Sequence, residues 1–268
     1  MPRKADIVTI NRDEAELTKN TDLFWKPKEA VHADPCHFLT ELLEKVENKE
    51  EYSDWLQQCK EADASRDAEI EEMAAAPASS GLINPLNLFM ELDKSLPDDA
   101  ILVADGGDFV ATASYILRPR SALSWLDPGP YGTLGVGGGF AIGAATIYPD
   151  RPVYIIYGDG SAGYSIVEID TAKRHNYDNI KILIGNDGAW TQILRAQKDI
   201  LGSPVANILS QSNYELIANA FDCQGQIIKN PENEKIRTSL EELSSASNPT
   251  ILNALIGSTQ FRDGSISV

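Results

Sequence analysis

Short apolar runs that end in glycine alternate with helical patterns over the last two thirds of the chain. The runs are rich in Val and Ile, which favours buried strands, and the segments between them carry apolar residues at helical spacing. Strands that alternate with helices predict an α/β fold, with a parallel sheet flanked by helices on both faces. A ligand is expected beyond the carboxyl ends of such strands. The clearest runs are 100–107, 152–160, 180–188 and 249–257.

The first third of the chain has a different pattern. A short strand is predicted at 5–13, and no partner strand is evident before the alternating region, so this segment is interpreted as the tail of a domain. A charged, Ala-rich stretch at 50–76 predicts an exposed connecting helix, and a Pro/Ser/Gly break follows it. The resulting division is a domain remnant at 1–47, a helical linker at 48–83 and the main domain at 84–268.

Charge and cysteine content exclude some classes of function. The net charge of −17 argues against a nucleic-acid or anionic-membrane surface, because binding phosphate needs clustered Lys and Arg. Three cysteines without a CxxC pair indicate a reducing, cytoplasmic-facing compartment. His32, Cys36 and His37 lack the further Cys or His pair of a zinc site, so a metal site there is not favoured. No apolar run reaches the roughly 18 residues of a membrane span.

Glycine and acidic residues gather where three of the predicted strands end. These ends lie at one edge of a parallel sheet, where glycines expose backbone N–H groups to a ligand. A helix starting near Ser161 would direct its positive N-terminus there, which suits a diphosphate, and the carboxylates then need a cation such as Mg²⁺. The alternative is that Gly and Asp only form turns. The Gly-Asp-Gly motif at 158–160 and the Asn-Asp-Gly motif at 186–188 are separated by the length of one helix and one strand. This spacing brings the chain back to a neighbouring strand end and favours the ligand site. The residues are Gly106, Gly107, Asp108, Gly158, Asp159, Gly160, Asn186 and Asp187.

These motifs carry a resemblance to a known family. The GDGS motif at 158–161, followed by the Asn-Asp pair, is similar to the metal-and-diphosphate motif of thiamine-diphosphate-dependent enzymes. The segment GPYGTLGVGGGFAIGAA at 129–145 resembles the part of that domain that holds the cofactor's pyrimidine ring. Together with the closing FRDGSISV, these segments resemble the acetolactate synthase-like proteins and 2-hydroxyacyl-CoA lyases. The resemblance implies a thiamine-diphosphate-binding fold, preceded by a remnant of a Rossmann-like central domain.

The resemblance also assigns roles to the matching residues. It implies Mg²⁺ ligands in the side chains of Asp159 and Asn186 and in the carbonyl of Gly188. Relatives often have two consecutive Asn residues where this chain has only Asn186, so ligation at that position rests on one side chain. Residues 190–192 (Trp-Thr-Gln) are expected either to face the substrate or to pack behind the metal loop. The implied residues for binding thiamine diphosphate are Gly107, Asp108, Phe109, Gly132, Leu134, Gly158, Asp159, Gly160, Ser161 and Asn186.

The family's activating glutamate is expected on a first domain outside this sequence, so no catalytic residue is assigned. Glu168 lies in the helix after the GDGS motif, on the wrong domain for that role. The implied reaction cleaves a 2-hydroxyacyl-CoA to an aldehyde and formyl-CoA. Acetolactate-type condensation of 2-oxo acids and a catalytically silent partner of a full-length relative remain alternatives. The expected partners are the small-molecule substrate and a second subunit, either the same chain or a full-length relative. A full-length form could attach to the endoplasmic reticulum membrane.

Overall fold

The computed structural model describes residues 5–19, 25–46 and 52–263. The chain divides into two compact units, unit 1 at Met1–Ala62 and unit 2 at Asp63–Val268. The boundary falls inside helix α3 (Ser53–Ala75), which matches the exposed connecting helix expected from its charged sequence. Only Ile70 and Ala74 of this helix are buried, and both belong to the part within unit 2.

Unit 1 contains a strand pair that the sequence analysis missed. Strand β1 (Val8–Asn11) pairs in parallel with β2 (Glu29–His32), so the prediction that β1 has no partner in this region was wrong. Strand β2 is largely exposed and lacks the apolar run by which a buried strand is recognised. Helix α2 (Pro35–Lys45) follows the turn η1 (Glu14–Glu16) and β2, and the Asp34 carboxylate caps its first turn.

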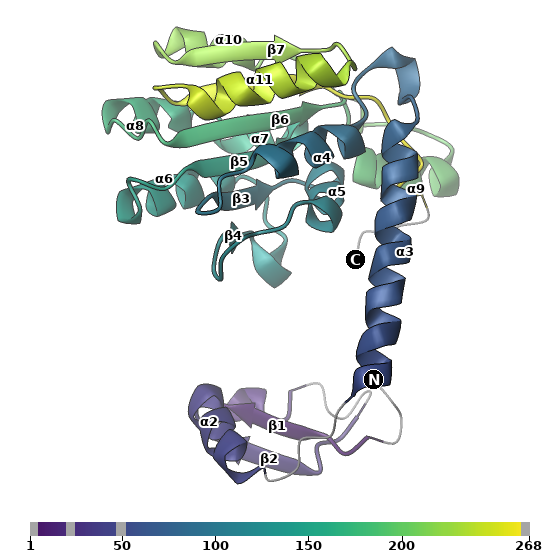
Figure 1. The fold of residues 1–268 in the computed structure, drawn as a ribbon, viewed down its shortest axis with the longest axis vertical. Helices are drawn as coiled ribbons and strands as arrows, with labels where there is room; N and C mark the ends of the chain where they lie inside the picture. The colour runs from purple at the N-terminus through teal and green to yellow at the C-terminus, as the bar shows by residue number, and fades with distance from the viewer. Residues whose placement is uncertain (1–4, 20–24, 47–51, 264–268) are drawn as a thin grey trace. The chain divides into compact units, whose positions relative to one another are not determined.

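Unit 2 is built on a six-stranded sheet in which every pairing is parallel (Figure 1). The spatial order is β4-β3-β5-β6-β8-β7. This sheet confirms the α/β fold class predicted from the alternating pattern. The strands are β3 (Ile101–Asp105), β4 (Trp125–Leu126), β5 (Val153–Gly158), β6 (Ile180–Asn186), β7 (Gln224–Ile228) and β8 (Thr250–Leu255).

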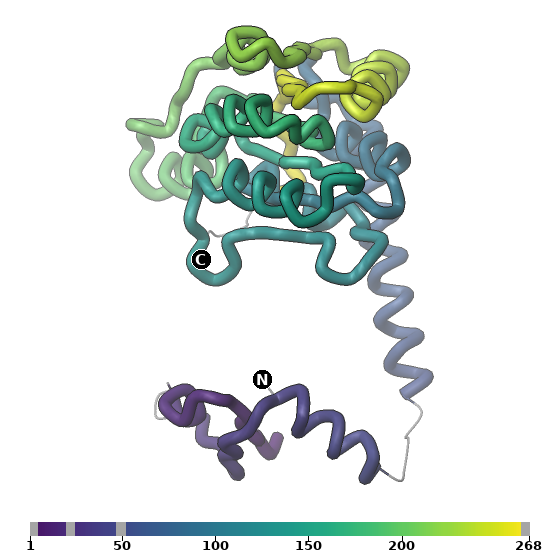
Figure 2. Tube along the Cα trace, turned by 90° about the vertical axis from the view of Figure 1, so that its left-hand side faces the viewer, coloured from purple at the N-terminus to yellow at the C-terminus, as the bar shows by residue number. Residues whose placement is uncertain are grey.

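Helices cover both faces of this sheet, which explains why its central strands are apolar without interruption. Figure 2 views unit 2 along the strands and shows the two helical layers. One layer contains α4 (Pro85–Ser95), α5 (Asp108–Ile116) and α11 (Asn233–Ser245), packed on a core that includes Leu102, Tyr154 and Leu252. The other contains α6 (Gly137–Ile147), α7 (Asp159–Ser165), α8 (Glu168–Arg174) and α10 (Glu215–Ala220), packed on Val103, Ile155 and Ile182.

After the neighbouring strands β3 and β5, the chain continues to opposite faces of the sheet. Strand β3 continues into α5 in one layer, and β5 continues into α7 in the other. Such a switch opens a crevice beyond the carboxyl ends of the two strands, which is where α/β sheets bind ligands. Helix α9 (Thr191–Leu201) follows the adjacent strand β6 at the same end. In the described part of the chain, no helix combines the length and apolar character needed to span a membrane.

Candidate functional site

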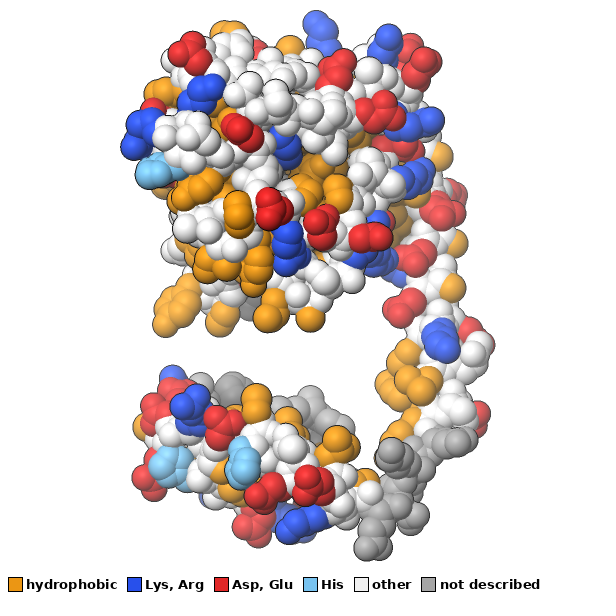
Figure 3. Space-filling model, turned by 60° about the vertical axis from the view of Figure 1, so that its left-hand side comes forward, with side chains coloured by type: hydrophobic (Ala, Val, Ile, Leu, Met, Phe, Trp, Pro, Cys, Tyr) orange, Lys and Arg blue, Asp and Glu red, His pale blue; other side chains and the backbone are white. Residues whose placement is uncertain are grey.

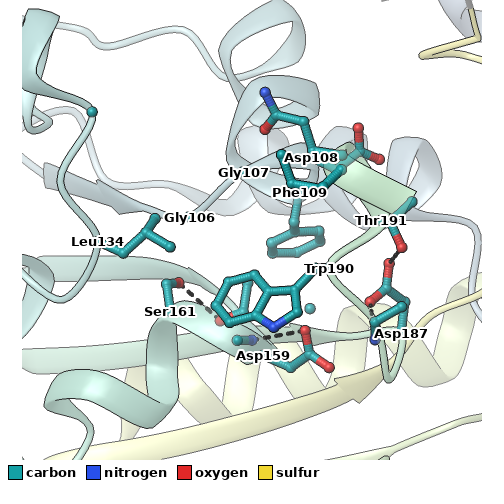
Figure 4. Close-up of a pocket in the computed structure, with 17 residues that line it drawn as sticks. Gly106, Gly107, Asp108, Phe109, Leu134, Asp159, Ser161, Asp187, Trp190 and Thr191 are labelled. Carbon is teal, nitrogen blue, oxygen red and sulfur yellow. Dashed lines mark hydrogen bonds between the residues drawn. The ribbon is translucent and has the colours of Figure 1, made fainter. Parts of the chain in front are cut away.

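A cavity of about 340 Å³ lies at the switch between β3 and β5 (Figure 4). It contains every residue predicted to bind thiamine diphosphate except Asn186, which is fully buried. Gly188, predicted as a metal ligand, is also not part of the cavity wall. The lining comes from 106–109, Gly132, Leu134, 158–161, Gly185, Asp187 and 189–193.

Asp159 joins the two loops of the predicted metal site. Its side chain is buried, and one carboxylate oxygen accepts a hydrogen bond of 2.8 Å from the Gly160 N–H. The other oxygen accepts a bond of 2.9 Å from the Gly188 N–H. Burial, with a smaller contribution from the nearby Asp187 carboxylate, raises the pKa of Asp159 to about 7. A cation placed here would therefore relieve an unfavourable concentration of negative charge.

Asn186 presents a buried oxygen that has no hydrogen-bond partner. Its amide group donates bonds to the Ser212 carbonyl at 2.9 Å and to Asn253 Oδ1 at 3.1 Å. Its own Oδ1 accepts none, although the residue is 0% exposed. Leaving a buried acceptor unsatisfied costs about 1–3 kcal/mol, so such an atom calls for an explanation. Amide and carboxylate oxygens are the ligands that Mg²⁺ takes, and this orphan oxygen fits a metal ligand.

The Gly188 carbonyl, the third predicted ligand, already accepts a hydrogen bond of 2.7 Å from the Leu209 N–H. A carbonyl oxygen has a second lone pair, so this bond leaves room for a metal contact. Gly188 has φ = +69°, a conformation that L side chains rarely adopt. Its N–H and carbonyl thereby face different partners in one tight turn.

The metal-loop side chains form part of the cavity wall. The sequence analysis left open whether residues 190–192 face a ligand or pack behind the loop, and all three line the cavity. The Trp190 ring lies against Gly160, where an added Cβ would come within 2.4 Å of it (Figure 4). An added Cβ on Gly107 would similarly meet Gln192 Oε1 at 2.6 Å. The absence of side chains at Gly107 and Gly160 therefore leaves room for Gln192 and Trp190 in the cavity wall.

Asp108 lies in the cavity wall, but its carboxylate is engaged elsewhere. It forms an ion pair with Arg195 of α9, and Arg262 Nε lies 3.9 Å away. Sequence analysis missed both arginines, because 87 residues separate Arg195 from Asp108 and no local motif links them. These ion pairs connect the first residue of α5 with α9, through Arg195, and with the segment after β8, through Arg262. We therefore expect Asp108 to act on the cavity through its backbone.

The opposite end of the cavity is formed by the segment after the turn η3 (Gly129–Tyr131). Gly132 adopts the left-handed conformation that ends this turn, and Leu134 is 36% exposed. The carboxylates among the described lining residues are Asp108, Asp159 and Asp187. Asp108 and Asp159 begin α5 and α7, the helices after β3 and β5, and Asp187 directly follows β6. Among the described lining residues, the segment that carries Gly132 and Leu134 therefore contributes no carboxylate.

The raised pKa of Asp159 predicts a pH-dependent stability for the metal-free chain. The unfolded carboxyl titrates near pH 3.8 and the folded one near 7, so between these values the folded state holds a proton that the unfolded state has released. The free energy of unfolding should thus fall as pH rises from about 4 to 7, by up to about 4 kcal/mol from this group. Thermal melts in chelator should show a smaller fall for Asp159→Asn, while the exposed control Asp150→Asn should follow the wild type. Equal falls in all three proteins would contradict the prediction.

Comparison with known proteins gives the site a context. The family model described as "Thiamine pyrophosphate enzyme, C-terminal TPP binding domain" matches residues 105–254. The chain is 44% identical over 274 residues to 2-hydroxyacyl-CoA lyase 2 of Caenorhabditis elegans, covering 100% of this chain and 43% of that protein. The protein of the same name from Homo sapiens is 41% identical over 272 residues, with the same coverage.

More distant similarity extends to a second kind of enzyme. A probable acetolactate synthase of Mycobacterium bovis is 33% identical over 174 residues, covering 65% of this chain and 31% of that protein. The chain thus spans about 43% of the length of the lyase relatives that it matches from end to end.

Proposed function

The chain belongs to the thiamine pyrophosphate enzyme family, and from this premise we propose that unit 2 binds thiamine diphosphate through Mg²⁺ as part of a carbon–carbon lyase. The observation that carries the proposal is that a buried carboxylate, Asp159, and a buried orphan oxygen, Oδ1 of Asn186, occur at the carboxyl ends of neighbouring strands. Asp159 directly follows β5, and Asn186 is the last residue of the adjacent strand β6. Calorimetric titration of the chain with thiamine diphosphate, with and without Mg²⁺, tests it: heat of binding is expected only when the metal is present.

Each wall of the cavity has a proposed role. Asp159, Asn186 and the Gly188 carbonyl would hold Mg²⁺. The backbone N–H groups of Gly160 and Ser161 would bind the diphosphate. The Gly160 N–H, which donates to the Asp159 carboxylate here, would change partner, and the Ser161 hydroxyl is occupied by main-chain carbonyls. On the opposite wall lie Gly107, Asp108 and Phe109; Gly158 forms the turn, and Gly132 and Leu134 would contact the pyrimidine. When bound, thiamine diphosphate supplies the electron sink for cleavage of a carbon–carbon bond.

We propose 2-hydroxyacyl-CoA as the substrate class, with cleavage between its thioester carbonyl carbon and the hydroxyl-bearing carbon. The products would be an aldehyde, one carbon shorter than the acyl group, and formyl-CoA. The relatives named 2-hydroxyacyl-CoA lyase 2 are 41–44% identical across 99–100% of this chain. The acetolactate synthase relatives match only 65% of it, at 33% identity. This difference favours lyase chemistry over condensation of 2-oxo acids.

The domain division is also a proposal. We propose that residues 84–268 form the cofactor-binding domain, 48–83 a helical linker and 1–47 a remnant of the preceding domain. The family match within 105–254 and the long exposed helix α3 support it. The compact-unit boundary at Ala62 lies inside the proposed linker.

We also propose that unit 2 associates with another subunit. Figure 3 shows hydrophobic side chains gathered on the surface of this unit. The exposed large apolar side chains of unit 2 include several from α6, from the segment before it and from the region around α7, and Tyr131 is 93% exposed. Exposed apolar groups in such number usually mark an interface. We call this set the apolar patch: Leu123, Tyr131, Phe140, Ile147, Tyr148, Tyr164 and Val167.

Sedimentation at micromolar concentration is expected to show association of the chain. Introducing charge into the apolar patch with Ile147→Glu and Val167→Glu should shift the protein toward monomer, because burying an unpaired carboxylate opposes association. Leu216→Glu provides a matched control, since this leucine is 54% exposed but lies on α10, outside the patch. A monomeric wild type that binds no hydrophobic dye would contradict the proposal.

A further inference from the structure

Asp105, which the sequence analysis did not assign to the site, ends β3 directly before Gly106, a residue of the cavity wall. The residue is 0% exposed, and the described part of the chain shows no ion pair to its carboxylate. Instead, one carboxylate oxygen accepts a hydrogen bond of 3.1 Å from the Gly135 N–H. The other accepts a bond of 2.7 Å from the Gly137 N–H. Burying a carboxylate that only backbone N–H groups stabilise costs free energy of folding. We therefore take its two hydrogen bonds to the segment 135–137 as an indication of its role.

The same residue also binds the diphosphate side of the cavity. The main-chain carbonyl of Asp105 accepts a hydrogen bond from the Ser161 hydroxyl, which also lies 3.0 Å from the Gly158 carbonyl. Ser161 belongs to the first turn of α7, directly after Asp159 and Gly160. Asp105 thus contacts both walls of the cavity: its side chain binds the Leu134 segment, and its backbone binds the start of α7.

Gly135 and Gly137, which donate their N–H groups to the Asp105 carboxylate, both lie where a side chain would clash. Gly135 has φ = +89°, and an added Cβ would lie 2.7 Å from Cβ of Tyr164. An added Cβ at Gly137 would lie 3.0 Å from Cβ of Asp105 and 2.8 Å from the Tyr157 ring. The segment is therefore confined between Asp105 and α7. Leu134 directly precedes Gly135, so fixing the Gly135 N–H also fixes the peptide group that Leu134 contributes.

We propose that Asp105 is a positioning residue that sets the separation between the pyrimidine wall at Leu134 and the diphosphate wall at α7. This inference rests on the proposed function, because it assumes that one ligand spans both walls. A ligand that contacts both walls should depend on Asp105. A ligand that contacts only the diphosphate wall should not.

The Asp105→Asn variant separates these two cases. The side-chain oxygen of Asn can still accept a hydrogen bond from one of the two glycine N–H groups. The new NH₂ group faces the other N–H, and because both are donors that hydrogen bond is lost. With Mg²⁺ present, we expect thiamine diphosphate to bind about tenfold more weakly, the effect of losing one charge-assisted hydrogen bond. Binding of inorganic pyrophosphate should be unchanged. Calorimetry with both ligands gives the two affinities, and equal losses for both would overturn the positioning role.

Two further variants control for a merely structural effect. Ser165→Ala removes a hydroxyl that contacts the Gly138 N–H and the Tyr157 hydroxyl at the same end of α6, without touching Asp105. It should lower the melting temperature but leave both affinities unchanged. Gly135→Ala should displace the Leu134 segment while keeping the buried carboxylate, and should reproduce the selective loss even if Asp105→Asn fails to fold.

Hydrogen exchange tests the same link without any ligand. In Asp105→Asn, amides within 129–138 should exchange faster, while those within 158–165 should keep their wild-type rates. Unchanged exchange at 129–138 would overturn the inference. Failure of the wild-type chain to bind either ligand with Mg²⁺ would instead overturn the proposed function, and the exchange result would still decide whether Asp105 holds the segment.

Discussion

Replacement of Asp159 by Ala should weaken Mg²⁺-dependent binding of thiamine diphosphate by about 100-fold or more. Changes to groups that only support a metal ligand already cost about 10–100-fold in affinity, and Asp159 is proposed as a direct ligand. The substitution also removes the acceptor of the Gly188 N–H, which fixes the loop that carries the third proposed ligand. Without the metal, the diphosphate would face Asp187 with no cation between them.

Titration of wild-type and variant chains in Mg²⁺ and in chelator measures this loss. Asp159→Asn keeps an oxygen acceptor but no charge, so its affinity should lie between those of the wild type and Asp159→Ala. Asp150→Asn removes an exposed carboxylate and should bind as the wild type does. Equal binding by Asp159→Ala, or wild-type binding that chelator leaves unchanged, would refute the metal site.

The sheet and the location of the candidate cavity could be predicted because both depend on local patterns. Apolar runs that end in Gly or Asp predict where strands end, and parallel pairing brings those ends to one edge of the sheet. The pair β1–β2 escaped prediction for the opposite reason, since Glu29–His32 is short and mostly exposed. Its pairing depends on tertiary context rather than on an apolar signal.

Long-range hydrogen bonds could not be predicted from the same patterns. Asp105 lies 30 residues before Gly135, and the sequence between them gives no sign that the carboxylate turns back to that backbone. The ring of Trp190 over Gly160 likewise depends on how two loops pack. Sequence identified Gly160 as a place of close approach but left open whether Trp190 faces the cavity. Which atom of Asn186 lacks a partner also required the positions of Ser212 and Asn253.

The purified chain, given Mg²⁺ and thiamine diphosphate, should show no detectable cleavage of a 2-hydroxyacyl-CoA. General acid–base catalysis contributes about 100- to 10,000-fold, and it needs a group within hydrogen-bond reach of the atom that exchanges a proton. The lining carboxylates among the described residues lie just after β3, β5 and β6, and none of them comes from the segment of Gly132 and Leu134. We therefore expect the activating carboxylate to be supplied by another polypeptide segment. Mass spectrometry of aldehyde and formyl-CoA measures the activity.

Addition of the part of the Caenorhabditis elegans relative that this chain does not match should restore cleavage, if that part carries the expected glutamate. The restored activity should disappear with Asp159→Ala in this chain, and separately with replacement of that glutamate in the added part, because each removes one half of the site. Substantial turnover by the chain alone would show that its own residues complete the site. Absence of rescue, in a chain that binds thiamine diphosphate with Mg²⁺ and associates with the added part, would instead favour a catalytically silent partner, since cofactor, metal and second subunit would all be present without chemistry.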